Sequence, residues 1–417
     1  MTGSSRYEHR VAVTGIGIVS PLGIGLERFW EAIVAGTIAT KTLTRFDASS
    51  YSARVAAQVD DFEPADFMTP RRVRWTERFA QFSVAATRLA LEDARFTPKP
   101  DDDDVGIWIG SALGGVAFGE EQHDKFRAGG IRAIRPLLAI AVFGGTATTN
   151  VALEFGLRGP NVANANSCAA GSVAIGEAFR AIAGGEVRAA VAGGVEAPLS
   201  PLVFGAFAII RSMSTRNGEP GRASRPFDRD RDGFVMAEGA GMFVLERYDD
   251  AVARGARIYG EICGFGLSGD AHHMTAPLPD GSGTARAMRA ALRDARVLPD
   301  EIELIDAHGS SSPLNDATEA RAIASAFGER GARVPVVATK GQHGHALGAT
   351  GAWEAAITLL AMERRTIPGL PNLDVRDPAL DVNVARKNRR SEARLALSNS
   401  TGFGGINAAL VLRAAGA

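Results

Sequence analysis

The chain has 417 residues, enough to bury a large core and to form two domains or one large duplicated domain. Its 46 Lys and Arg residues balance 47 Asp and Glu residues, so the net charge of −1 gives no indication of nucleic-acid binding. With only two cysteines we expect no disulfide framework and a reducing, cytoplasmic location. No run of about 18 apolar residues indicates a membrane span, and residues 1–10 (MTGSSRYEHR) lack the apolar stretch of a signal peptide.

Strand-like apolar runs alternate with helix-like segments along the chain. In chain order, the segments that matter most are the strand-like residues 11–20, an amphipathic helix around residues 76–96, and strand-like residues 105–111, 302–306 and 334–339. This alternation predicts an α/β fold in which a parallel-type sheet is covered by helices on both faces.

The apolar runs also indicate a weak internal duplication. Residues 11–20 (VAVTGIGIVS) resemble residues 257–266 (RIYGEICGFG), because each is a strand-like run that leads into glycines. We therefore predict two similar halves, residues 1–255 with the candidate nucleophile and residues 256–417 with the candidate catalytic histidines.

Cys168 stands between a strand-like segment and a helix of small residues. Residues 159–163 predict a turn and a short buried strand, and residues 169–184 (AAGSVAIGEAFRAIAG) predict the helix. The partial positive charge and free N–H groups of a helix N-terminus favour the thiolate, which is the nucleophilic form. A lone cysteine is more often a core residue, so the catalytic interpretation depends on partners elsewhere in the chain.

Two other strand–loop junctions supply such partners. His308 lies in residues 307–313 (AHGSSSP), directly after a strand-like run, and His345 lies in residues 340–349 (KGQHGHALGA), after another. Loops at the C-terminal ends of strands are where α/β sheets usually hold their ligands. Three junctions thus carry Cys, His, and Lys with His.

Other patterns are weaker. Gly15 and Gly17 follow a strand as in a dinucleotide fingerprint, but Ser20 stands where the third glycine belongs. The remaining histidines and nearby acids show no zinc-type spacing such as His-Glu-x-x-His, so we expect neither a metal nor another bound cofactor.

A series of ordered motifs relates the chain to a known family. They are residues 13–23 (VTGIGIVSPLG), 225–228 (RPFD), 237–241 (AEGAG), the His308 loop, 340–351 (KGQHGHALGATG) and 402–407 (GFGGIN). Over essentially its whole length the chain resembles the elongating, type II β-ketoacyl-acyl carrier protein synthases of the thiolase superfamily. The resemblance implies the thiolase fold, with duplicated halves and two central sheets in a five-layered α-β-α-β-α sandwich, usually as a dimer.

The resemblance also implies the chemistry of the site. Cys168 would take an acyl group from a phosphopantetheine thioester, and a malonyl thioester would lose CO₂ and attack it as an enolate. His308 and His345 would donate hydrogen bonds to the enolate, and the backbone N–H groups of Cys168 and Phe403 would form the oxyanion hole. Lys340 would pair with Glu319 and hold the His308 loop.

Further residues match the family's substrate-binding loops. Ser310 and Ser312 stand where threonines usually bind the pantetheine arm. Phe403 matches the gating aromatic residue, and its neighbours Gly402 and Gly404 would let the loop move. The remaining candidate substrate-site residues are Asp270 and His273 in a second mobile loop, and Thr401. His273 could assist decarboxylation or substrate entry, or could be purely structural.

Four arginines match family positions that meet the acidic carrier protein, namely Arg71, Arg74, Arg132 and Arg211. Their alternative interpretation is a solvated basic surface. Partners implied by the resemblance are an acyl carrier protein on which all substrates travel, and either a second copy of this chain or a homologue of the chain-length-factor type.

Departures from the family pattern favour a specialised substrate. Asn166 and Ser167 precede the nucleophile where housekeeping enzymes have Thr-Ala, Thr401 and Ile406 replace a Phe and a Thr, and His343 adds an imidazole near His345. We therefore predict a type II polyketide, polyene or other specialised synthase. The alternatives are a housekeeping fatty-acid elongation synthase and, in another class, a non-catalytic chain-length-determining partner, which typically lacks the nucleophile. The C-terminal glycine loop has no second cysteine, which argues against a thiolase.

Overall fold

A computed structural model describes residues 7–99 and 101–416; part of the segment considered above for a signal peptide, residues 1–6, lies outside them. Its central feature is a sheet with the strand order β12-β11-β15-β16-β10-β1-β9-β7-β5-β6, and β2 pairs with β1 off this path. The strands of the first half are β1 (Val11–Ser20), β2 (Gly23–Ile24), β5 (Val105–Gly110), β6 (Asn161–Asn164), β7 (Ala189–Glu196) and β9 (Gly239–Arg247). Those of the second half are β10 (Gly260–Gly269), β11 (Leu304–Asp306), β12 (Val336–Val337), β15 (Leu395–Gly402) and β16 (Ile406–Ala414).

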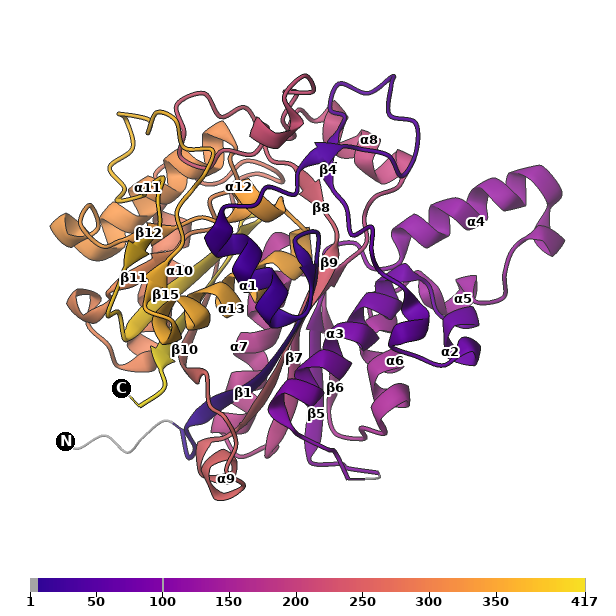
Figure 1. Ribbon diagram of the computed structural model, residues 1–417, viewed down its shortest axis with the longest axis horizontal. Coiled ribbons are helices and arrows are strands. Elements are labelled where there is room, and N and C mark those ends of the chain that lie inside the picture. Colours follow the sequence, from indigo (N-terminus) through magenta and orange to yellow (C-terminus); the bar gives the residue numbers. More distant parts are fainter. Residues whose placement is uncertain (1–6, 100, 417) are drawn as a thin grey trace.

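The two halves of the sheet repeat one strand order. The first half runs β1-β9-β7-β5-β6 and the second runs β10-β16-β15-β11-β12. A short antiparallel pairing of β1 with β10, in which Val11 faces Ile262 and Val13 faces Gly260, joins them. Figure 1 shows the first half mainly on the right, in indigo and magenta, and the second half on the left, in orange and yellow.

Only part of each half-sheet is parallel. β5 pairs in parallel with β6 and β7, and β11 pairs in parallel with β12 and β15, whereas β1, β9, β10 and β16 run antiparallel to their neighbours. The expectation of a parallel-type sheet was therefore wrong for the central strands β1, β9, β10 and β16. The chain reverses direction between β7 and β9 and between β15 and β16, so each of these pairs is antiparallel.

Helices form three layers around the two half-sheets. α7 (Ala170–Ala183) and α13 (Thr350–Glu363) lie between them, α3 (Arg78–Ala94) covers the outer face of the first half, and α10 (Ser282–Ala295) covers that of the second. The small residues predicted for α7 are required by this arrangement, since a Cβ on Gly171 would lie 2.7 Å from the carbonyl oxygen of Gly348. The five-layered α-β-α-β-α sandwich is thus confirmed.

The other elements surround this sandwich. The remaining α-helices are α1 (Leu26–Ala35), α2 (Pro70–Arg74), α4 (Val116–Gly129), α5 (Leu138–Ala141), α6 (Thr146–Phe155), α8 (Pro201–Ile209), α9 (Tyr248–Ala253), α11 (Pro313–Phe327) and α12 (Lys340–His343). Short strands pair outside the main sheet as β3 (Lys41–Thr42), β4 (Val55–Ala57) and β8 (Met236–Ala237), and as β13 (Thr366–Ile367) and β14 (Arg389–Arg390). Across residues 7–99 and 101–416, no helix is both long and apolar enough to span a bilayer.

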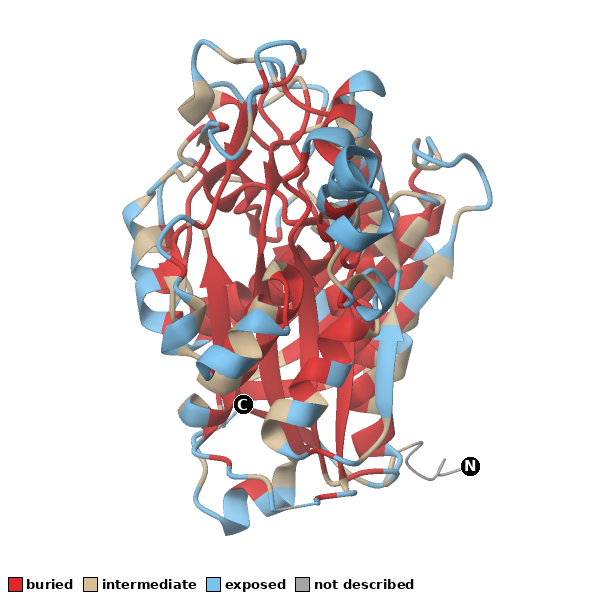
Figure 2. Cartoon of the chain, turned by 90° about the vertical axis from the view of Figure 1, so that its right-hand side faces the viewer, coloured by how far each residue is buried: buried red, intermediate tan, exposed pale blue. Residues whose placement is uncertain are grey.

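Burial follows the layers. Figure 2 shows the strands and the loops at one end of the sheet buried, with exposed residues on the outer helices and peripheral loops. One predicted strand differs: residues 159–163 were expected to contain a short buried strand, but Asn161, Val162 and Ala163 of β6 are exposed. The reason is its place at the edge of the sheet, which periodicity alone does not determine.

Candidate active site

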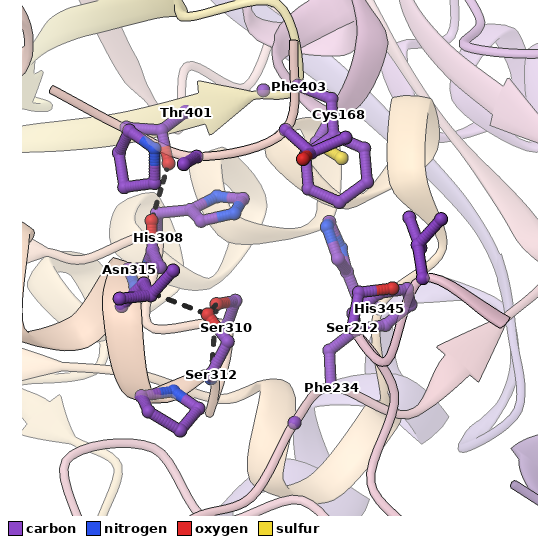
Figure 3. A pocket seen from close by; sticks show the side chains of 18 of the residues that line it. Cys168, Ser212, Phe234, His308, Ser310, Ser312, Asn315, His345, Thr401 and Phe403 are labelled. Carbon is purple, nitrogen blue, oxygen red and sulfur yellow. Dashed lines mark hydrogen bonds between the residues drawn. The ribbon is translucent and has the colours of Figure 1, made fainter. Parts of the chain in front are cut away.

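A cavity of about 300 Å³ lies at the loop end of the sheet and brings the three predicted junctions together. Cys168, His308 and His345 all line it, with Thr401 and Phe403 from the C-terminal glycine loop. Figure 3 shows the rings of His308 and His345 extending into one space beside Cys168 and Phe403. The residues come from both halves of the chain, so neither half holds the cluster alone.

Cys168 is held in a tight turn directly before α7. The turn is a 3₁₀ segment, Ser167–Ala169, and Ser167 adopts a left-handed φ of 51°, which is unfavourable for a residue with a side chain. Gly402 packs against this turn so closely that a Cβ on it would lie 2.9 Å from the Cβ of Ser167. The glycine loop therefore fixes the position of the nucleophile from the other half of the fold.

The cysteine is not a preformed thiolate. It is buried, and burial raises the pKa of Cys168 to about 12, despite opposing effects of the Lys340 charge and of the backbone N–H groups of Phe403 and Cys168. The sequence analysis considered only the helix N-terminus, which favours the thiolate; in the resting site the desolvation of the buried thiol outweighs the nearby positive charge. Those same two N–H groups reach the sulfur, so the groups predicted to form the oxyanion hole lie beside the nucleophile.

Glu319 holds the His308 loop through the backbone. Its two carboxylate oxygens accept hydrogen bonds from the backbone N–H groups of His308 (2.6 Å) and Gly309 (2.8 Å). The side-chain amide of Asn399 donates a third, at 2.8 Å. Glu319 thus positions His308, as expected, but without the predicted lysine.

Lys340 pairs with Glu354 instead of Glu319, which corrects the predicted ion pair. Its fully buried ammonium contacts the Glu354 carboxylate and donates to the backbone carbonyl of His308. Burial raises the pKa of Glu354 to about 7, against the lowering effect of Lys340. The sequence analysis missed Glu354, although a carboxylate in the middle of the mostly apolar helix α13 was a signal.

Both cavity histidines are neutral. Burial and the nearby Lys340 charge hold the pKa of His308 and of His345 well below the usual value. Their rings meet edge to face with centroids 5.1 Å apart. Nζ of Lys340 lies 3.4 Å from Nδ1 of His308, and because an ammonium only donates, this contact leaves the proton of His308 on Nε2. Nδ1 of His345 lies 3.1 Å from the hydroxyl of Thr350, which can donate or accept.

His343 does not belong to this cavity. Its Nε2 lies 2.9 Å from the Thr339 hydroxyl, and its ring packs against Trp353 with centroids 5.2 Å apart. Burial lowers the pKa of His343 to about 3. The added imidazole therefore lies outside the cavity although it is near His345 in sequence, since the turn at Gly344 directs the two histidines into different environments.

The two predicted mobile loops are hydrogen-bonded to each other. The N–H of Gly404 donates to the carbonyl of Met274 at 2.7 Å, and the N–H of Asp270 donates to that of Gly405 at 2.8 Å. Phe403 stacks on Phe207 of α8, with ring centroids 6.0 Å apart. Any movement of the glycine loop must therefore break contacts with the second loop and with α8.

The predicted substrate residues divide into two groups. Asp270, Ser310, Ser312 and Thr401 line the cavity. His273 is exposed outside it, and its Nδ1 accepts backbone hydrogen bonds from the two residues that follow Met274. These contacts are those of a residue with a structural role, which was one of the two roles considered for His273.

Hydroxyl groups form a polar wall of the cavity. The hydroxyls of Ser310 and Ser312 lie 3.0 Å apart, and that of Thr401 donates to the side-chain oxygen of Asn315 at 2.8 Å. Figure 3 shows Thr401 above His308 and the two serines below it. Asn315, on α11, was not predicted, because it contacts the cavity only through the packing of α11 against the glycine loop.

The four predicted docking arginines lie in two places. Arg71 and Arg74 are exposed on α2, and Arg135, close to Arg132 in sequence, donates to the carbonyl of Arg74 at 2.5 Å. Arg211 instead lines the cavity. Within the part of the chain that the structure describes, no group of three or more His, Cys, Asp or Glu residues is arranged to hold a metal ion.

Comparison with known protein families agrees with this geometry. The model of the beta-ketoacyl synthase N-terminal domain matches residues 8–251, and that of the C-terminal domain matches residues 259–374. The chain belongs to the beta-ketoacyl synthase family. It is therefore an acyltransferase that catalyses a decarboxylating condensation.

Individual relatives cover almost the whole chain. The 3-oxoacyl-[acyl-carrier-protein] synthase 2 of Coxiella burnetii is 42% identical, over 97% of this chain and 98% of its own. Among solved structures, the ishigamide ketosynthase/chain length factor is 35% identical with a TM-score of 0.90, over 98% of this chain and 100% of that chain. A type II PKS acyl-carrier protein in complex with its ketosynthase bound to the hexaketide is 32% identical with a TM-score of 0.90, over 97% and 99%. These similarities confirm the thiolase fold.

The raised pKa of Cys168 predicts its reactivity. The rate of alkylation by iodoacetamide should increase about tenfold per pH unit and continue to rise beyond pH 9, because only the thiolate reacts. The rate is measured by mass spectrometry of the Cys168 peptide, with a small thiol as reference and the Cys168→Ser variant as control. A plateau of the Cys168 rate near neutral pH would contradict the buried-thiol description.

Proposed function

We propose that this beta-ketoacyl synthase elongates acyl chains carried on an acyl carrier protein, with Cys168 as the nucleophile. One observation carries the proposal: a buried thiol and two neutral imidazoles line the same cavity, beside N–H groups that reach the sulfur. The substrates arrive as thioesters of the carrier's phosphopantetheine arm, so the reaction needs no separate cofactor.

In the first step Sγ of Cys168 attacks the carbonyl carbon of the acyl thioester. The thiol proton passes to Nε2 of His345, which can accept it in the tautomer whose Nδ1–H donates to the Thr350 hydroxyl. The tetrahedral oxyanion is stabilised by the N–H groups of Cys168 and Phe403. Its collapse releases the pantetheine sulfur, which takes the proton back from His345.

In the second step a malonyl thioester enters, and its bond to the carboxylate carbon breaks to release CO₂. The electron pair forms an enolate, whose oxygen accepts a hydrogen bond from Nε2–H of His308 and, in its other tautomer, of His345. The enolate carbon attacks the acyl carbonyl, and the resulting intermediate expels the Cys168 thiolate, which takes up one proton from solvent to restore the resting thiol. The product is a β-ketoacyl chain lengthened by two carbons.

The comparisons support ordinary fatty-acid elongation better than the specialised pathway that the sequence favoured. The curated relatives named 3-oxoacyl-[acyl-carrier-protein] synthase 2 reach 42% identity, whereas the polyketide ketosynthase structures reach 35%. Among the departures from the family pattern next to the glycine loop, only Thr401 lines the cavity. It places a hydroxyl group where the family has an aromatic ring. We therefore propose fatty-acid elongation as the function of this enzyme, with specialised biosynthesis as the alternative.

We infer that an acyl carrier protein docks through the exposed arginines of α2 and the adjacent segment around Arg132. In the described structure no carboxylate forms an ion pair with Arg71, Arg74 or Arg132, so their charge is free to attract an acidic partner. A similar ketosynthase has been solved with its carrier protein bound. Arg211, at the cavity, would meet the phosphate of the incoming arm.

We also infer that the chain assembles as a dimer through β6. Its exposed edge leaves backbone donors and acceptors unpaired, which a second strand can pair. Large apolar side chains are exposed on β6 itself (Val162) and on the helix α6 that packs against it (Leu153). Pairing of a second strand with β6 would remove such side chains from water together with the unpaired edge.

Condensation is tested with malonyl-carrier protein and a saturated or a polyunsaturated acyl-carrier protein, followed by intact mass spectrometry. Cys168→Ala should abolish acylation, whereas His308→Ala should leave acylation and lower condensation by about 100-fold or more, as for loss of one oxyanion donor. Preference for the saturated chain supports fatty-acid elongation, and preference for the polyunsaturated chain supports a specialised synthase. Absence of acyl-Cys168 with every substrate would favour the non-catalytic partner.

Carrier docking is tested by reversing charge on α2. The double variant Arg71→Glu, Arg74→Glu should raise KM for the acyl-carrier protein about tenfold, with kcat little changed, because surface charges act mainly on encounter. Arg293→Glu, at an exposed position on α10, is the matched control. If the double variant and the Arg293→Glu control have equal KM values, α2 is not part of the docking surface.

Assembly is tested by light scattering of the purified chain. The wild type should be a dimer, and Val162→Lys should shift it to monomer, because the charge would be buried at the paired edge. Leu298→Lys, which alters an exposed leucine in the second half, should remain dimeric. A wild-type monomer that dimerises only with a homologue would instead indicate a chain-length-factor partner.

A further inference from the structure

An acyl group on Cys168 needs a space for its tail. On one side Cys168 lines the cavity already described; on the other it belongs to a buried apolar cluster that includes Leu199, Phe204 and Leu347. If Cys168 is acylated as proposed above, the tail is expected to enter this cluster, where apolar surface is removed from water. The packing of the cluster therefore limits which chains fit.

Three aromatic rings fill the cluster beyond Cys168. Phe204 of α8 is fully buried, and its ring centroid lies 5.7 Å from that of Phe46 and 6.2 Å from that of Tyr51. The Tyr51 hydroxyl donates to the carbonyl of Pro201 at 3.2 Å, which fixes Tyr51 against the start of α8. A Cβ on Gly205 would lie 2.7 Å from the Tyr51 ring, so helix and ring are already in closest contact.

A second cavity of about 370 Å³ lies behind this aromatic cluster. Phe46 and Leu199 line it as well as belonging to the cluster. Its lining also holds several charged residues, including Arg45, Glu77, Arg78, Glu120 and Glu238. An aliphatic tail in this cavity would displace water from charged groups and offer no hydrogen bonds in return, which is unfavourable.

The charged groups of the lining are held in place by hydrogen bonds. The Glu238 carboxylate pairs with Arg45 and accepts two hydrogen bonds from Arg78, at 2.9 Å each. The Glu77 carboxylate accepts the N–H groups of the first turn of α3, and burial raises its pKa to about 7. The second cavity is thus a polar boundary behind the aromatic rings.

We propose that Phe204 sets the length of the acyl chain that Cys168 accepts and restricts the enzyme to short chains. Each methylene that finds apolar space is worth about fourfold in kcat/KM. In the wild type the increase in kcat/KM stops at the chain length at which the acyl tail reaches the Phe204 ring. Removing the ring opens room for a few more methylenes, up to Phe46 and Leu199, where the charged cavity begins.

The test measures kcat/KM for acylation of Cys168 by butyryl- and octanoyl-carrier protein, in the wild type and in Phe204→Val. The wild type should prefer butyryl, and the variant should raise the octanoyl-to-butyryl ratio about 15-fold, as expected for two methylenes at about fourfold each. Phe179→Val removes a buried ring from α7 that lines neither cavity and should leave the ratio unchanged.

Two results would overturn the proposal: a wild type that accepts octanoyl as readily as butyryl, or an unchanged ratio in Phe204→Val. The wild-type profile decides even if that variant does not fold, and Phe204→Leu, a milder truncation, should shift the ratio in the same direction. If the proposed function itself is wrong, no acyl chain of any length is transferred to Cys168, and this result differs from a failure of the chain-length proposal.

Discussion

The buried ammonium of Lys340 is the constraint on which the site depends. A cation removed from water must be met by partners, and here the Glu354 carboxylate and the carbonyl of His308 meet it. The same charge helps to hold the pKa of both cavity histidines well below their usual value and fixes the tautomer of His308. One side chain that does not line the cavity thus ties α12 and α13 to the loop after β11 and adds to the effect of burial on the pKa values of the two histidines that do.

Burial gives the resting site an uncharged reactive surface. Desolvation disfavours the thiolate of Cys168 and the imidazolium of His308 and His345 alike. Negative charge then develops only during the reaction, on the acyl and enolate oxygens, where preorganised N–H donors meet it. Such a site suits a reaction that passes through two oxyanions more than one that needs a preformed ion.

The duplicated fold explains why the site needs both halves. The turn before α7 and the turn before α13 are equivalent, and each holds a left-handed residue, Ser167 with φ 51° and Leu347 with φ 42°. The two helices pack through glycines, so these turns lie side by side. The first half places a nucleophile at its turn, whereas the second places His345 just before its own. The glycine loop after β15 then closes over Cys168.

Sequence alone determined the alternation of elements, the duplication, the family, and the positions of Cys168, His308 and His345, because these follow from local periodicity and from motifs at strand ends. It did not determine which carboxylate meets Lys340, that His343 packs on Trp353, that His273 lies outside the cavity, or that β6 is an edge strand. Each of these depends on how elements distant in sequence pack together. The protonation of Cys168 was also decided only by the tertiary structure, since a helix N-terminus favours the thiolate but burial costs it more.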